Sequence, residues 1–230
     1  MFLIDYWYIV LVIPAVILGM IAQVKVKSTF EKYSRVYSRR GYTGADVARI
    51  ILDKNGLYNV RVERIRGHLT DHFDPRENVV RLSESVYDSS SVASIGVAAH
   101  EVGHALQYAK SYAPMKMRAA VIPVTRIGST VAPLLIMLGF LMWLEPVIIV
   151  GVVLYSTIAV FQLITLPVEF NASRRALATL EGEGILDKSG ELSGARRVLT
   201  AAAMTYVTAL IMTLAYILRF ILLVAGNRRD

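Results

Sequence analysis

The segment His100-Glu101-Val102-Gly103-His104 has residue types and a spacing that can hydrolyse bonds with a metal ion. Residues four apart lie on one face of a helix, so both imidazoles can reach one zinc ion at about 2.0–2.1 Å. Glu101 is rotated by about 100° from His100 and can approach a water molecule on that zinc from the side. Zinc lowers the pKa of such a water towards about 7, and a carboxylate can then take its proton. The pattern therefore predicts a zinc hydrolase with Glu101 as general base.

The alternative is that His100 and His104 are core histidines bonded to other polar groups. The neighbouring residues predict a buried helix whose polar groups are those of the motif: Val97, Ala98, Ala99, Val102, Gly103, Ala105 and Leu106. A buried Glu101 without a cation nearby would be costly, which favours the metal site.

A catalytic zinc needs a third protein ligand and an open position. The chain has no cysteine, which excludes disulfide scaffolds, iron–sulfur clusters and thiolate zinc sites. His68 and His72 are four apart but fall in a region patterned as strand and turn. We favour Glu169, which follows the third apolar run on the same predicted side of the membrane as the histidines. The alternative for Glu169 is an interfacial carboxylate paired with Arg174 or Arg175.

Four long apolar runs predict helices that cross about 30 Å of hydrocarbon. They cover residues 6–24, 127–144, 146–168 and 198–218, and the last continues to Ala225. The third helix is expected to end at Pro167, just before Glu169. Residues 92–109 are also apolar, but polar groups of the HEVGH motif would be costly facing lipid, so this stretch is predicted as a buried helix outside the membrane.

Composition and charge agree with a membrane protein. Hydrophobic residues make up 55% of the 230 residues, above the roughly 45–50% of soluble domains. The formal charge is +7, from 25 Lys and Arg against 18 Asp and Glu. These charges cluster beside the apolar runs, which suits an anionic membrane surface better than nucleic acid. Their placement predicts that the loops holding His100 and Glu169 are cytoplasmic and that the turn at Glu145 is external.

The segment before the HEVGH helix predicts a small α+β arrangement. Thr43 and Asp46 form a potential capping box, and Asn55-Gly56 predicts the end of that helix. Alternating apolar residues predict strands at 58–63 and 78–82. Ser89–Ser91 offer N-caps for the helix at 92–109. The predicted fold class is thus a mainly α membrane protein with four transmembrane helices and a small α+β domain.

Several motifs together carry a resemblance to a known family. HEVGH followed by Glu-Phe-Asn-Ala-Ser-Arg-Arg-Ala resembles the gluzincin metallopeptidases. More closely, TGADVARIILDKNGL, HLTDHFDPRENVVRLSESVY, HEVGHALQ and LPVEFNASRRAL resemble the small bacterial membrane-bound zinc metallopeptidases, the neutral zinc metallopeptidase family. The resemblance covers nearly the whole chain. It implies a bacterial plasma membrane, His100, His104 and Glu169 as ligands, and Glu101 as base. The pair of histidines and the absence of alternative ligands predict one Zn²⁺ per chain.

The apolar runs and the charge pattern, together with this resemblance, give the expected organisation of the chain. We expect transmembrane helix 1 in residues 1–24, a cytoplasmic zincin-like region in 25–118, transmembrane helices 2 and 3 in 119–168, a cytoplasmic segment with the third zinc ligand in 169–197, transmembrane helix 4 in 198–225 and a tail in 226–230.

The sequence departs from the CAAX-protease and HtpX-like relatives, which carry Glu-x-x-x-Asp with an Asp that orients a ligand histidine. Ser173 stands at that position here, so support for the ligands could come from Ser173 or Asn171. The group that stabilises the oxyanion is equally open, with Arg174, His72 and several tyrosines as candidates.

The segment 68–82 precedes the HEVGH helix, and the resemblance suggests that it forms an edge strand that pairs with an extended substrate. A free sheet edge can hold peptides of varied sequence through their backbone. The alternative is a structural hairpin. Within it, His72 and Asp74 could support the ligands, line the cleft or form the turn.

The predicted function is a membrane zinc endopeptidase that cuts membrane-associated proteins or peptides close to the bilayer, with no nucleic-acid partner. Alternatives are a catalytically silent zinc scaffold, for which an intact Glu101 is unnecessary, and a metal transporter, which would keep its ligands inside the spanning helices. An intramembrane zinc protease would need an Asp-Gly pair, which the chain lacks. The same ligands also bind cobalt, nickel or manganese.

Overall fold

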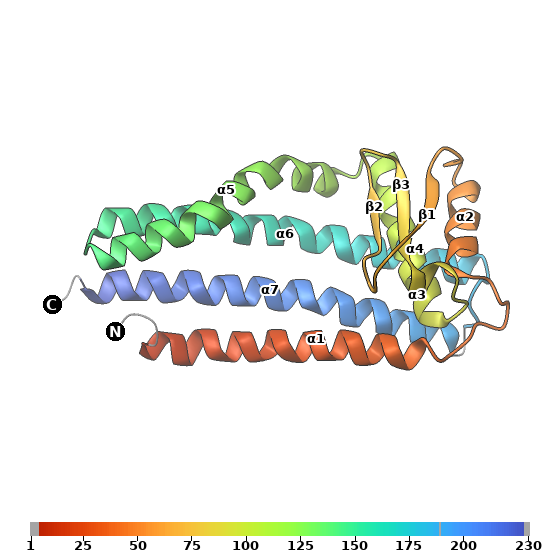
Figure 1. Cartoon of the computed structure of the whole chain (residues 1–230), viewed down its shortest axis with the longest axis horizontal. Coiled ribbons are helices and arrows are strands. Elements are labelled where there is room, and N and C mark those ends of the chain that lie inside the picture. The colour runs from red at the N-terminus through yellow and green to blue at the C-terminus, as the bar shows by residue number, and fades with distance from the viewer. Residues whose placement is uncertain (1–4, 189, 228–230) are drawn as a thin grey trace. The chain divides into compact units, whose positions relative to one another are not determined.

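A computed structural model of the chain describes residues 5–188 and 190–227 (Figure 1). A π-helical turn, Tyr8–Val12, leads into helix α1, and three short strands and six further helices follow. The elements in chain order are α1 (Ile13–Tyr33), α2 (Gly44–Lys54), β1 (Arg61–Ile65), β2 (His72–Asp74), β3 (Val79–Ser83), α3 (Glu84–Tyr87), α4 (Val92–Ala109), α5 (Ala113–Leu141), α6 (Glu145–Gly182) and α7 (Glu191–Asn227).

Among the residues that the structure describes, four helical stretches are long and apolar enough to cross a membrane: Tyr8–Tyr33, α5, α6 and α7. The predicted fold class, a mainly α membrane protein with four spanning helices and a small α+β part, is confirmed. α1 and α6 continue past the ends of their apolar runs, α5 and α7 begin before theirs, and α5 ends at Leu141, inside the run 127–144. The chain remains helical where its sequence becomes amphipathic.

The expectation that the third membrane helix ends at Pro167 is wrong, because Pro167 lies inside the continuous helix α6. A proline removes one backbone hydrogen bond, but the helix continues where packing stabilises its next turns. Four apolar residues after Pro167 are spaced by four and almost completely buried: Val168, Ala172, Ala176 and Leu180. Glu169 therefore lies within a helix that is held on one face by the core.

The described residues form two compact units. The first contains the chain up to Gln23, Lys116–Leu166 and the chain from Met204 onward, and the second contains Val24–Met115 and Pro167–Ala203. In the first unit, α5 and α6 approach closely at glycines. A Cβ atom on Gly139 would lie 2.8 Å from the backbone nitrogen of Ile148, and one on Gly128 would lie 2.7 Å from the carbonyl oxygen of Leu154. Small residues permit such packing between membrane helices.

An ion pair joins the two ends of the chain within the first unit. The Arg219 guanidinium donates to the Asp5 carboxylate at 2.5 and 2.8 Å and lies 5.2 Å from the centre of the Tyr8 ring. Both charged side chains are mostly buried, so each compensates the other for its lost hydration.

The second unit contains a three-stranded sheet in the order β1-β3-β2. β1 runs parallel to β3, and β2 runs antiparallel to it. The sequence placed the first strand at 58–63, but residues 58–60 form a turn and β1 starts at Arg61. The sequence pattern did not predict β2 as a separate strand. Because β3 lies between β1 and β2, the strand of segment 68–82 that lies at an edge of the sheet is β2.

The helices of the second unit begin and end largely where the sequence predicts. Thr43 and Asp46 form the capping box of α2, and Asn55 ends this helix with Gly56 at a φ of +72°. Ser91 caps α4 by accepting a hydrogen bond from the Ser94 N–H at 3.1 Å. α4 packs against α2, α3 and the sheet, so it forms the centre of the hydrophobic core.

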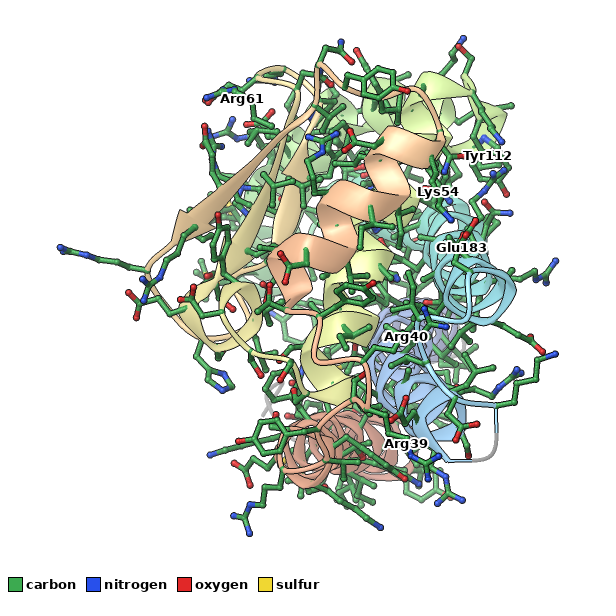
Figure 2. All side chains as sticks on the ribbon, turned by 90° about the vertical axis from the view of Figure 1, so that its right-hand side faces the viewer. Arg39, Arg40, Lys54, Arg61, Tyr112 and Glu183 are labelled. Atoms are coloured by element: carbon green, nitrogen blue, oxygen red, sulfur yellow. The ribbon has the colours of Figure 1, made fainter. Side chains whose placement is uncertain are left out.

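Polar contacts attach the α6–α7 connection to the first half of the second unit. Lys54 of α2 forms an ion pair with Glu183, and both side chains are labelled in Figure 2. Arg39 reaches Asp187 at 3.0 Å, and its backbone N–H donates to Glu191 at 2.8 Å. These contacts hold the segment after Glu169 against the segment that contains α4.

Within this unit, α4 and α6 approach each other closely at Gly103. A Cβ atom on Gly103 would lie 2.8 Å from the carbonyl oxygen and 3.2 Å from the Cα atom of Ala172. The backbone atoms leave no room for a side chain, so a glycine is required for this approach.

We expect Gly103→Ala to lower the free energy of unfolding by about 1–3 kcal/mol, because the added methyl group must push α4 and α6 apart. Thermal unfolding of the detergent-solubilised protein measures this effect. Gly182→Ala is the control, because a Cβ atom there would meet open space. Equal melting temperatures for Gly103→Ala and the wild type would contradict the close approach.

Candidate metal centre

Helix α4 holds His100 and His104 one turn apart. Their ring centres are 4.7 Å apart and their planes cross at 83°. The helix is buried on nearly all sides, and its core residues include Ile95, Ala98 and Val102. The two imidazoles therefore have a fixed backbone and little freedom to turn away from each other.

Glu169 comes from α6 and faces both rings. Its Oε2 atom lies 3.3 Å from Nε2 of His100 and 3.6 Å from Nε2 of His104. The side chains of His100, His104 and Glu169 are 15%, 10% and 4% exposed. The structure thus brings together the three residues that the sequence selected as possible ligands.

The donor set fits a divalent transition metal. The three potential ligand atoms all lie within 4.8 Å of one another. Among residues 5–188 and 190–227, His100, His104 and Glu169 are the group of side chains that could hold a metal ion. Tetrahedral zinc with bonds of about 2.0–2.1 Å separates its ligand atoms by about 3.3 Å, close to the two distances between imidazole nitrogen and carboxylate oxygen. Two imidazoles and one carboxylate leave one position open, as in catalytic zinc sites.

The local electrostatics also favour a cation. Burial alone would lower the pKa of His104, but a hydrogen bond to Glu169 and the negative charges of Glu101 and Glu169 outweigh it and raise that pKa. The carboxylates therefore stabilise positive charge at the point where the imidazole nitrogens meet.

Glu101 follows His100 on α4 and is 9% exposed. Its charge acts on His104, so its carboxylate lies within electrostatic range of the cluster. Glu101 is not one of the three potential ligands. A carboxylate close to a metal site that does not bind the metal can accept a proton.

The far nitrogens of both imidazoles also have partners. Ser173 Oγ lies 3.1 Å from Nδ1 of His100, and Gln107 Oε1 lies 3.0 Å from Nδ1 of His104. Gln107 donates in turn to the Val168 carbonyl at 2.8 Å and to Asn171 Oδ1 at 3.1 Å. Ser173 and Asn171 were candidates from the sequence, whereas Gln107 was missed. Its position three residues after His104, on the next turn of a buried helix, was the signal that could have found it.

Other candidates lie elsewhere in the second unit. Among the described residues, the group that could hold a metal ion includes neither His68 nor His72. The ring of His68 packs edge-on against Phe30. His72 is exposed, and its Nδ1 lies 2.8 Å from the Thr70 carbonyl oxygen.

Arg174 is exposed on α6. Arg175, an alternative partner for Glu169, donates from Nε to Asn171 at 2.7 Å.

Asp74 forms the turn between β2 and β3, one of the roles considered for it. Its carboxylate accepts from the Arg76 N–H at 2.8 Å, and this bond lowers its pKa. Asp71 holds the start of the same hairpin by accepting from the Ser83 N–H at 2.7 Å. These two carboxylates fix the path of β2 beside β3.

The sequence is similar to known sequences over nearly its whole length. The sequence model of the family described as "Putative neutral zinc metallopeptidase" matches residues 8–225. The chain is also similar to "Putative membrane protease YugP" of Bacillus subtilis (strain 168), with 50% identity over 223 residues, which cover 97% of this chain and 99% of that protein. No solved structure matches the chain. Because the family match spans nearly the whole chain and includes all three clustered residues, the chain belongs to the neutral zinc metallopeptidase family.

Proposed function

We propose that this protein is an integral membrane endopeptidase that uses one zinc ion held by His100, His104 and Glu169, with Glu101 as general base. The observation that carries the proposal is the convergence of two imidazole nitrogens and one carboxylate oxygen on a common point. Two histidines and one glutamate are the protein ligands of several zinc peptidases. A silent scaffold or a transporter would not need Glu101 in the same helical turn.

Zinc bound there would supply a Lewis acid that polarises a peptide carbonyl and lowers the pKa of water towards about 7. Glu101 would take a proton from the attacking water as the oxygen of that water adds to the carbonyl carbon. The same carboxyl group would then give that proton to the amide nitrogen as the C–N bond breaks. Water is consumed, and a new carboxyl group and a new amine are formed.

The strand β2 is our candidate for the edge that holds the substrate. Within the sheet, β2 pairs with β3 on one side only, whereas β3 is paired on both sides. α4 contacts β2, and the ring of Phe73 lies 5.9 Å from that of Tyr108, four residues after His104. An extended peptide added to this edge would lie along the helix that carries the imidazoles.

We further propose that the substrates are membrane-associated proteins or peptides. Glu169 directly follows Val168, the last residue of the uncharged run 146–168, within one helix. A ligand bond of about 2 Å would keep the metal close to that level of α6. Tethering to the same bilayer raises the effective concentration of a substrate, up to the millimolar range for short tethers.

For the location, we propose a bacterial plasma membrane with the active site in the cytoplasm. Positive residues follow the first apolar run and occupy the segment after the third: Lys25, Lys27, Lys32, Arg35, Arg39, Arg40, Arg174, Arg175, Lys188, Arg196 and Arg197. The turn between α5 and α6, residues 142–144, carries no Lys or Arg, and α6 begins with Glu145. This asymmetry is typical of cytoplasmic loops on the first two segments and an external turn.

Replacing Glu101 with Gln tests the catalytic role. The amide keeps the size of the side chain but cannot accept a proton at neutral pH, so we expect peptide hydrolysis to fall by about 10²–10⁴. Zinc content measured on the same purified protein should stay at that of the wild type. His104→Ala is the matched comparison, because it should lose zinc and activity together.

Two outcomes would contradict this assignment. Hydrolysis by Glu101→Gln at the wild-type rate would show that another group activates the water. A wild-type protein that binds zinc but cuts no peptide, tethered or free, would favour the scaffold.

Single cysteines test the orientation, because the natural chain has none. Met142 in the α5–α6 turn and Tyr58 after α2 are both exposed, so neither substitution should disturb the core. In intact cells, a membrane-impermeant maleimide should label Met142→Cys and spare Tyr58→Cys. Both should react after lysis, and the opposite pattern in intact cells would place the active site outside.

A further inference from the structure

Gln107 is completely buried, and its amide connects α4 to α6. It is the last polar residue of the buried part of α4 and lies beside His104 on the next turn. A buried amide loses its hydration, so it is stable only when each of its donors and acceptors has a partner. Its three hydrogen bonds meet this demand and also restrict how the amide can be oriented.

Hydrogen-bond polarity can be followed from Arg175, because a guanidinium only donates. Arg175 Nε donates to the side chain of Asn171 at 2.7 Å, so Asn171 must present its oxygen there. The same oxygen lies 3.1 Å from Gln107 and can only accept, so Gln107 must present its NH₂ group.

The Val168 carbonyl independently requires the same orientation of the Gln107 amide. It lies 2.8 Å from the amide of Gln107, and a carbonyl oxygen can only accept. Both NH₂ protons are therefore directed towards α6. The amide oxygen of Gln107 must face the remaining neighbour, Nδ1 of His104, at 3.0 Å.

An oxygen opposite Nδ1 requires that this nitrogen carry the proton. Neutral His104 then has its free lone pair on Nε2, the atom 3.6 Å from Glu169 Oε2. We propose that Gln107 is a positioning residue, which holds His104 in the tautomer that can bind the metal and ties this ligand to the turn of α6 that carries Glu169.

His100 provides an internal contrast. Its Nδ1 faces Ser173 Oγ at 3.1 Å, and a hydroxyl group can either donate or accept. Ser173 therefore permits both tautomers of His100, whereas Gln107 permits one tautomer of His104. Gln107 therefore fixes the hydrogen-bond polarity at His104, whereas Ser173 leaves it open at His100.

The proposal rests on the proposed metal site, but its first readout needs neither metal nor substrate. In metal-free protein at a pH where imidazoles are neutral, the ¹⁵N shifts of His104 should show a protonated Nδ1. Gln107→Met keeps an unbranched side chain of similar length but offers no amide, so the proton should redistribute towards Nε2.

The second readout is zinc affinity, measured by competition with a chelator. Loss of a group that orients a ligand histidine weakens metal binding by about 10–100-fold, and we expect Gln107→Met to fall in this range. Gln162→Met is the matched control, because it removes an amide from α6 whose buried oxygen has no hydrogen-bond partner among the described residues. Its zinc affinity should equal that of the wild type.

A wild-type His104 that carries its proton on Nε2 would overturn the proposal, even if Gln107→Met failed to fold. Unchanged zinc affinity in folded Gln107→Met would overturn it too. A wild-type protein that shows the Gln107-dependent tautomer and zinc affinity but hydrolyses no peptide would refute the peptidase function and leave this inference intact.

Discussion

The close approach of α4 and α6 at Gly103 is the constraint on which the metal centre depends. The two imidazoles are separated by one helical turn, so the sequence spacing brings them together, but their third partner comes from a helix 65 residues further along the chain. Glu169 reaches them because the backbone at Ala172 can almost touch α4 where Gly103 has no side chain. A larger residue would separate the helices and move the carboxylate away from the rings.

Burial of the cluster strengthens the electrostatic interactions among its side chains and also removes their hydration, which costs free energy. Three polar side chains with exposed fractions of 15% or less are surrounded by the apolar core of the second unit. Such groups are stable only when they are fully hydrogen-bonded or bind a cation. Ser173 and Gln107 satisfy the outer nitrogens of the rings, and Glu169 faces the inner ones. The arrangement leaves the inner atoms for a metal ion.

Local patterns in the sequence were sufficient for several elements. The spacing of His100 and His104 needs only helical geometry, and Thr43 and Ser91 cap their helices within a few residues. Local patterns were not sufficient to select Glu169 as the third ligand. That prediction also used the charge asymmetry, which puts Glu169 on the same predicted side of the membrane as the histidines, and the family resemblance. β2 was missed because its three residues, His72–Asp74, are too few to show an alternating pattern.

The remaining differences have non-local causes. Pro167 does not end α6, since burial of the following turns outweighs the lost backbone bond. Gln107 was overlooked because its role depends on Val168 and Asn171, which are more than 60 positions away in the chain. The apolar residues Val168, Ala172, Ala176 and Leu180 do have a helical spacing. A hydrogen bond between distant helices leaves no such periodic signal.

X-ray absorption at the zinc edge of the detergent-purified protein tests the central claim most directly. The account predicts nitrogen and oxygen neighbours at about 2.0–2.1 Å, with the multiple scattering of two imidazole rings. Zinc surrounded by oxygen alone, without imidazole scattering, would contradict the centre formed by His100, His104 and Glu169.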